Sequence, residues 1–122
     1  MGDKAVFPIR ASVVFLIADH SMELKELEAR MHAFVAAKGW YEADSPKPQT
    51  PRNLAASLAI EAAEILEHFQ WQPDVKDKAA LAGELADVAL YLLQLASLAG
   101  VDLEQAILDK LALNQKRQWP AP

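Results

Sequence analysis

The chain has 122 residues and a mass of 13.4 kDa, with 52% hydrophobic and 24% charged residues, which suits one globular domain and excludes a disordered tail. Cysteine is absent, which excludes disulfides, zinc–thiolate sites and cysteine nucleophiles, and three histidines leave carboxylates as the main candidates for metal ligands. A net charge of −5 argues against a basic nucleic-acid-binding surface, and no uninterrupted apolar run approaches the roughly 18 residues of a membrane span.

The first 21 residues differ from the rest of the chain. A short apolar segment, residues 11–18, is followed by no small-residue cleavage site, so it is a poor match to a signal peptide. Its β-branched residues favour a strand, which would need a partner surface because an isolated strand is marginally stable. Met22 is an equally good natural start. We therefore assign residues 1–21 as an extension of unknown role and residues 22–122 as the domain.

Two helices are expected in the first half of the domain. Ser21 is a suitable cap for the first, which should run to Gly39 because apolar residues recur at helical spacing (Leu24, Leu27, Met31, Phe34 and Val35). A loop containing two prolines should follow. Thr50 and Pro51 then have the residue types of an N-cap and a first helical position, and the second helix should end near Trp71, just before a proline.

Two more helices are expected in the second half. Residues 79–100 are apolar nearly all round, so we expect this third helix to be the most buried element and to end at Gly100. Residues 102–105 resemble a capping box that opens a fourth helix, which should continue to about Gln118. Short connections predict an all-α fold, an antiparallel bundle of about four helices.

Two pairs of acids interrupt these apolar helices. Glu61 and Glu64 lie three residues apart on the second helix, about 60° around its axis, and Glu84 and Asp87 have the same spacing on the third. A lone buried carboxylate is costly, and two such pairs on facing helices would repel each other unless a cation lay between them. Oxygen-only ligands suit a hard divalent cation, and magnesium is the natural choice.

The acid pairs have two other interpretations. Each pair could instead be the solvated face of an amphipathic helix, although both pairs are embedded in apolar sequence. A ferritin-like di-iron bundle would need a Glu-x-x-His motif on each of two helices. The residues three before His32 and His68 are Ala29 and Ile65, so neither histidine completes that motif.

The domain resembles a known family over roughly residues 22–120. The matching residues are the two acid pairs together with residues 51–54, 61–71, 84–88, Tyr91, 101–103 and Lys110-x-x-x-Asn114-x-x-Arg117. In this order and spacing they are similar to the MazG-like, all-α nucleoside triphosphate pyrophosphohydrolases, and most similar to the dCTP pyrophosphatase branch of that family.

The resemblance implies an enzyme that converts a nucleoside triphosphate and water into the monophosphate and pyrophosphate. It implies magnesium on Glu61, Glu64, Glu84 and Asp87, with manganese as a substitute, and a homodimer or homotetramer with sites between chains. It also implies dCTP or a modified dNTP as the substrate, a cytoplasmic role in cleaning the nucleotide pool, and no nucleic-acid or membrane partner. The alternative is a non-catalytic helical scaffold module, which the complete set of four acids disfavours.

The resemblance also implies roles for residues of the last two helices. Lys110, Asn114 and Arg117 form one stripe of the fourth helix, where they are expected to contact phosphates and sugar. Without the family, the same stripe suits a solvated basic end of a helix. Tyr91 follows Asp87 by one turn and is expected to face the site, although a core tyrosine would have the same spacing.

Two tryptophans are implied to hold the base. In the family, aromatic residues at the positions of Trp40 and Trp71 flank the base; tryptophans at helix ends are otherwise most often partly buried packing. For the catalytic step, Glu61 is the preferred residue to orient the attacking water, and Glu67 is the second candidate.

Two features depart from the family pattern. Met31 stands where the branch has a histidine, and His32, one residue later, lies about 100° further round the helix. The tail at residues 118–120 is one residue longer than the pattern before its aromatic and proline. Both departures concern base specificity and leave the acid set intact.

Overall fold

The computed structural model describes residues 22–122, and the expectations for residues 1–21 lie outside this part of the chain. Within it the fold is all-α, as predicted, with no strand. The four helices are α2 (Leu24–Ala37), α3 (Pro51–Glu67), α4 (Lys78–Leu98) and α5 (Leu103–Lys116).

Side-chain caps begin three of these helices. In each, the cap oxygen accepts a hydrogen bond from the backbone N–H three residues later, at 3.0–3.2 Å, and the capping residues are Thr50, Asp77 and Asp102. The capping box predicted at α5 is half formed. The side chain of Gln105 donates forward to Asp109 at 2.8 Å instead of back to the cap.

Helix boundaries differ slightly from the predictions. Glu23 is the N-cap of α2 without a side-chain cap bond, and the predicted cap, Ser21, lies outside the described residues. α3 ends at Glu67 and not near Trp71, because the N–H of His68 bonds to the carbonyl three residues back and tightens the last turn. Gly100 follows α4 with a φ of 75°, a backbone conformation that favours glycine.

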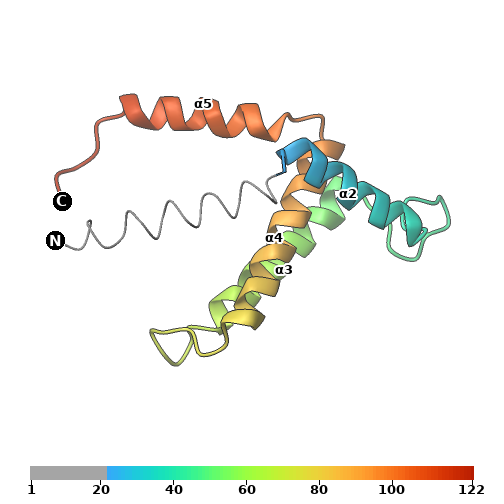
Figure 1. Ribbon diagram of the computed structural model, residues 1–122, viewed down its shortest axis with the longest axis horizontal. Coiled ribbons are helices and arrows are strands. Elements are labelled where there is room, and N and C mark those ends of the chain that lie inside the picture. Colours follow the sequence, from blue (N-terminus) through green and yellow to red (C-terminus); the bar gives the residue numbers. More distant parts are fainter. Residues whose placement is uncertain (1–21) are drawn as a thin grey trace.

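α4 is the central helix of the chain. It runs antiparallel beside α3 along most of its length, α2 crosses near its C-terminal end, and α5 leads away from that end (Figure 1). The core is small: Met31, Val35 and Leu93 form one cluster, with Leu24, Trp40 and Leu103 packed around it, and Leu54 of α3 is also buried. A single chain is therefore an antiparallel helix pair with a crossing helix and a projecting helix.

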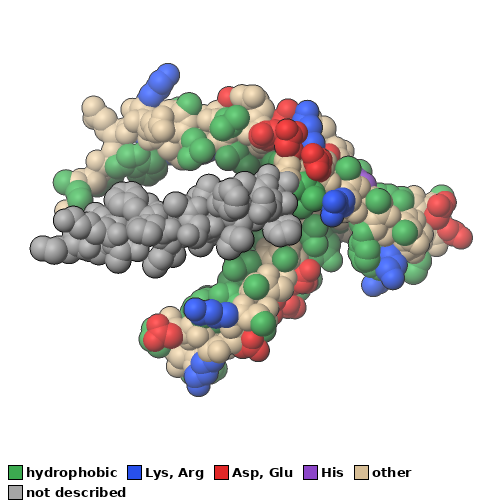
Figure 2. All heavy atoms as spheres, viewed as in Figure 1, with side chains coloured by type: hydrophobic (Ala, Val, Ile, Leu, Met, Phe, Trp, Pro, Cys, Tyr) green, Lys and Arg blue, Asp and Glu red, His purple; other side chains and the backbone are tan. Residues whose placement is uncertain are grey.

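As expected, α4 is the least exposed of the four described helices, but much of its surface stays uncovered within one chain. Only Leu93 and Gln94 of α4 are buried, because α2 and α3 cover just two of its sides. Figure 2 shows further hydrophobic side chains along α5. The large apolar residues that remain at least 40% exposed on α3, α4 and α5 are Ile60, Leu66, Leu85, Leu90, Leu92, Leu98, Ile107, Leu108, Leu111 and Leu113.

α4 also meets the length and composition of a membrane-spanning helix. An 18-residue window reaches a mean hydropathy of 1.4, with 17% of the window buried, because the two acids are diluted by long apolar stretches. The central helix of a protein assembly has the same composition. Within one chain, α3 and α2 pack against this helix.

Candidate active site

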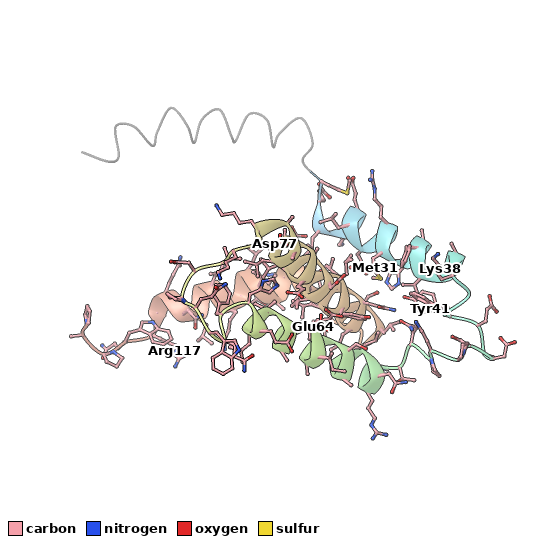
Figure 3. The ribbon with its side chains drawn as sticks, turned by 90° about the horizontal axis from the view of Figure 1, so that it is seen from below. Met31, Lys38, Tyr41, Glu64, Asp77 and Arg117 are labelled. Carbon is pink, nitrogen blue, oxygen red and sulfur yellow. The ribbon has the colours of Figure 1, made fainter. Side chains whose placement is uncertain are left out.

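The four predicted acids lie where α3 and α4 run side by side. Glu64 lies on α3 beside α4 (Figure 3). The pKa of Glu61 is raised, first by burial, then by a hydrogen bond with Glu64 and by the negative charges of Glu64, Asp87 and Glu84. Glu61 is therefore close enough to the other three acids for their charges to act on it.

The donor set fits a hard divalent cation. Oε2 of Glu61 is buried without a hydrogen-bond partner, and carboxylate oxygens are the ligands that magnesium prefers. Between residues 22 and 122, no three His, Asp or Glu side chains are already arranged to hold a metal ion. Instead Glu84 forms a hydrogen bond with His68, so the single magnesium site stays a prediction.

His68 is a neighbour of the acid cluster that the sequence analysis did not assign. Its Nε2 forms a hydrogen bond with Oε2 of Glu84 from the opposite helix. The signal was present in the sequence, because His68 follows Glu64 by four residues and so lies on the same face of the chain at the end of α3. His68 thereby holds one carboxylate of α4 toward α3.

We expect Glu61→Gln to stabilise the metal-free protein at neutral pH. A raised pKa means that the native state holds the proton of Glu61 more tightly than the unfolded chain does. Ionisation of Glu61 therefore costs no stability well below its ordinary pKa of 4.5, and it lowers the free energy of unfolding as the pH rises through the raised pKa. Glutamine removes this ionisation. The Tm of the Glu61→Gln protein, measured in EDTA at pH 7, should therefore exceed that of the wild type by about 2 °C or more.

The control for this comparison is Glu26→Gln, an exposed acid in the first turn of α2. The advantage of Glu61→Gln should vanish near pH 4, where Glu61 is neutral in both states. A wild-type Tm that rises relative to Glu61→Gln between pH 4.5 and pH 7 would contradict the raised pKa.

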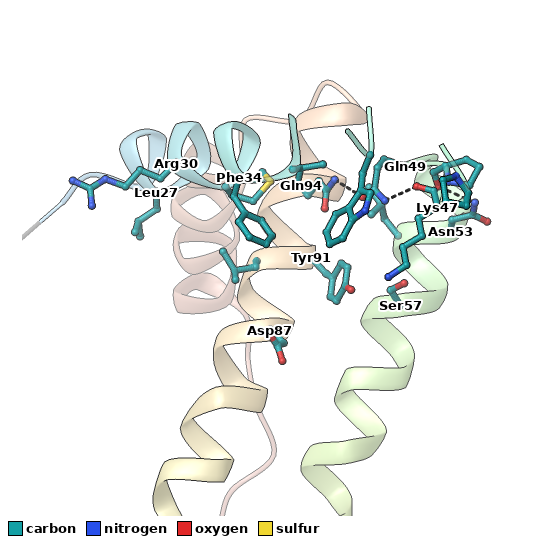
Figure 4. A pocket seen from close by; sticks show the side chains of 17 residues that line it. Leu27, Arg30, Phe34, Lys47, Gln49, Asn53, Ser57, Asp87, Tyr91 and Gln94 are labelled. Carbon is teal, nitrogen blue, oxygen red and sulfur yellow. Dashed lines mark hydrogen bonds between the residues drawn. The ribbon is translucent and has the colours of Figure 1, made fainter. Parts of the chain in front are cut away.

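A cavity of about 770 Å³ lies next to the acids, between α2, α3 and α4. Figure 4 shows Phe34 and Tyr91 on its walls and Asp87 at its lower edge. Asp87 therefore belongs both to the acid cluster and to the cavity. Its other lining residues are Leu27, Arg30, Met31, Val35, Trp40, Pro46, Lys47, Pro48, Gln49, Asn53, Leu54, Ser57, Leu90 and Gln94.

Aromatic and basic groups gather in this cavity. Trp40 meets Phe34 edge-on, with ring centroids 5.8 Å apart, and Nζ of Lys47 lies 5.0 Å from the centroid of the Trp40 ring. Met31 is 5% exposed and lines the cavity, whereas His32 lines a second cavity behind it. A flat ring with a phosphate chain has the shape and charge that such a cavity accommodates.

The remaining predicted contacts are not brought to the cavity by the same chain. Trp71 is 88% exposed beyond the end of α3 and does not line the cavity. Lys110, Asn114 and Arg117 lie on or at the end of α5, which leads away from α3 and α4 (Figure 1). Oδ1 of Asn114 is buried without a hydrogen-bond partner.

Gln94 is a second residue of this region that the sequence analysis missed. It is 3% exposed and lines the cavity near the end of α4. Its spacing was informative, because Asp87, Tyr91 and Gln94 stand at positions i, i+4 and i+7 of one helix and so share a face. An amide in the most apolar of the four described helices is the signal that could have revealed it.

An all-helical chain with two facing carboxylate pairs beside an aromatic cavity matches one known family in sequence. The MazG-like family model covers residues 56–121. The chain belongs to this family, which confirms the family predicted from the acid pairs and the residues around them.

Known proteins similar to this chain include nucleotide pyrophosphatases. The dCTP pyrophosphatase 1 of Bos taurus is 40% identical over 97 residues, covering 72% of this chain and 55% of that protein. A dATP/dGTP diphosphohydrolase of Cyanophage S-2L is 35% identical over 91 residues, covering 75% of this chain and 76% of that protein. The chain thus spans about half the length of the mammalian relative, and the predicted dCTP pyrophosphatase branch is confirmed as a similarity.

A solved structure supports the fold. A pyrophosphatase from Archaeoglobus fulgidus DSM 4304 superimposes with a TM-score of 0.66 and 33% sequence identity, covering 80% of this chain and 93% of that one. The helical arrangement is therefore shared with a protein described as a pyrophosphatase.

Proposed function

We propose that this protein hydrolyses a nucleoside triphosphate to the monophosphate and pyrophosphate. The observation that carries the proposal is the position of Asp87, which joins the four-carboxylate cluster to an aromatic cavity large enough for a nucleotide base. The names of the mammalian and phage relatives, both nucleotide hydrolases, support the same reaction.

We propose that the metal is magnesium, with manganese as a substitute. Four carboxylates would hold it, those of Glu61, Glu64, Glu84 and Asp87. When bound, the cation supplies positive charge against the triphosphate. His68 orients one of the four, since it contacts Glu84. The raised pKa of Glu61 suits a group that takes a proton, because a base works best when its pKa approaches the working pH.

The proposed reaction is an in-line attack of water on the α-phosphorus. Glu61 orients the water and accepts its proton as the new oxygen–phosphorus bond forms. The bond from the α-phosphorus to the bridging oxygen breaks, and pyrophosphate leaves with that oxygen. Glu67 is a weaker candidate for the base, because it is exposed at the end of α3 and is not among the acids that raise the pKa of Glu61.

The base would lie in the cavity. Trp40 and Tyr91 supply flat walls, and stacking on one such ring is worth roughly 1–3 kcal/mol in proteins that bind single strands. We propose dCTP or a modified dNTP as the substrate, on the similarity to dCTP pyrophosphatase 1, and a role in removing unwanted nucleotides from the cytoplasmic pool.

We further propose that the working protein is a homodimer or homotetramer. Trp71, Lys110, Asn114 and Arg117 lie away from the cavity of their own chain, and apolar side chains remain exposed on three helices. A second copy could cover those side chains and bring these four residues to the cavity. Sites between chains would then complete the base and phosphate contacts.

Trp71→Ala should raise KM more than it lowers kcat. Stacking on the base is nearly equal in the ground and transition states, so its loss weakens binding with little effect on the chemical step. We expect KM to rise about fivefold or more, from the stacking energy above. Because Trp71 is 88% exposed within its own chain, the substitution should leave the helical content of each chain unchanged.

Trp71→Phe is the matched variant, and it should restore most of the affinity because it keeps a flat ring. Steady-state kinetics of the three proteins on dCTP give the answer. A loss of kcat in Trp71→Ala with KM unchanged would remove Trp71 from the base site.

A pyrophosphate-release screen over the common and modified dNTPs, with magnesium, with manganese and with EDTA, tests the proposed function as a whole. We expect release with either metal, fastest on a cytosine nucleotide, and none in EDTA. Release from no nucleotide would favour the alternative, a non-catalytic helical module that keeps the fold.

A further inference from the structure

A chain of hydrogen bonds crosses the core from the cavity to the far side of α2. Gln49 and Gln94 meet at 2.7 Å, Gln94 reaches the hydroxyl of Tyr41 at 3.2 Å, and that hydroxyl reaches Nδ1 of His32 at 2.5 Å. The last hydrogen bond of the series joins Nε2 of His32 and Oγ of Ser97, at 2.8 Å. These side chains come from α2, from α4 and from the connection between α2 and α3.

A backbone carbonyl determines which groups donate and which accept in this series of hydrogen bonds. The carbonyl of Lys47 only accepts hydrogen bonds, so the group of Gln49 that lies 2.7 Å from it must be the amide nitrogen. The oxygen of Gln49 is therefore the atom turned toward Gln94. Gln94 must in turn present its own nitrogen to that oxygen.

Both hydrogens of the Gln94 amide are used in this arrangement. One bonds to Oε1 of Gln49 and the other to the hydroxyl of Tyr41. Burial raises the pKa of Tyr41, with an opposing and smaller effect of the Gln94 bond, so the hydroxyl that contacts His32 stays protonated. The only group that Gln94 has left is Oε1, an acceptor, which points into the cavity (Figure 4).

We infer that Oε1 of Gln94 selects the base by accepting a hydrogen bond from an exocyclic amino group. The inference rests on the proposed function, because it places the base in this cavity. The amino group of cytosine or adenine supplies the N–H that this acceptor lacks. A base with a carbonyl at that position turns a second acceptor toward Oε1, and a buried acceptor without a proton is costly.

The acceptor is held in place on two sides, so it cannot rotate to suit a carbonyl. Turning the amide of Gln94 over would place its oxygen against Oε1 of Gln49, so that two acceptors would face each other without a proton between them. Gln94 is therefore a specificity-determining residue, and the hydrogen bonds from Gln49 to Ser97 are its support.

Binding of non-hydrolysable α,β-imido nucleotides by titration calorimetry tests this inference without depending on turnover. The wild-type protein, with magnesium, should bind the dCTP analogue at least about tenfold more tightly than the dUTP analogue and than a pyrimidin-2-one analogue that lacks the amino group. Gln94→Met has nearly the same shape but no acceptor, and it should bind the three nucleotides within about threefold of each other. The matching pair for adenine is the dATP analogue and its unsubstituted purine counterpart, which shows whether cytosine, adenine or both are read.

Tyr41→Phe is the control within the same network, because it removes one support but keeps Oε1 and its bond to Gln49. It should retain the preference for the amino group. Equal binding of all nucleotides by the wild type, or a preference that survives in Gln94→Met, would overturn the inference, and so would failure to bind any nucleotide. Tight, selective binding without pyrophosphate release from dCTP would instead contradict the proposed function and leave the assignment of Gln94 standing.

Discussion

Glu84→Gln should lower kcat by about 10³-fold or more while the helical content stays unchanged. Glutamine has the shape of glutamate but no charge, so it weakens a cation site built only from carboxylates, and electrostatic stabilisation of the transition state is the main contribution that such a site makes. The fold should survive because the amide oxygen of glutamine still accepts the hydrogen bond from His68.

Glu26→Gln, on the exposed side of α2, is the matched control and should keep full activity. Titration calorimetry with magnesium alone gives a readout besides activity, and binding should be weaker in Glu84→Gln than in either the wild type or the control. If Glu84→Gln kept most of its activity, the four-carboxylate site would be wrong.

The second large effect concerns assembly. Sedimentation at micromolar concentration should show at least a dimer, and Leu111→Asp should shift the protein toward the 13.4 kDa monomer. Leu111 is 54% exposed in the middle of α5, so it makes little contribution to the core of its own chain, and a charge there is costly only where another copy covers it. Activity should fall more than about tenfold, because α5 carries three of the predicted phosphate and sugar contacts.

Leu111→Met keeps the apolar surface and should retain both the assembly and the activity. The comparison separates the loss of an interface from the loss of a side chain. A wild-type protein that sediments as a monomer would contradict the proposed assembly, and an active monomeric Leu111→Asp would show that one chain holds the complete site.

The helices were predictable because their ends are encoded locally. Thr50 with Pro51, Asp77 and Asp102 cap helices in the structure as their residue types indicate. The end of α3 was placed four residues too late, since the apolar character of Phe69 and Trp71 extends the pattern while the backbone has already turned. Local sequence therefore predicted the starts of helices better than this end.

The candidate site was predictable in part. The spacing of the acid pairs places each pair on one face of a helix, and the structure sets the two faces against each other. Gln94 and His68 escaped prediction because their partners, Tyr41 and Glu84, are distant in sequence, at 53 and 16 residues. Trp71 and α5 make few contacts with the rest of their own chain, so neither periodicity nor spacing could place them relative to the cavity.

The central claim is that water attacks the α-phosphorus beside the carboxylate cluster, and hydrolysis of dCTP in ¹⁸O-labelled water tests it most directly. ³¹P NMR of the products locates the label by its isotope shift. We expect one labelled oxygen in the nucleoside monophosphate and none in pyrophosphate. Label confined to pyrophosphate would mean attack on the β-phosphorus and would contradict the proposed reaction.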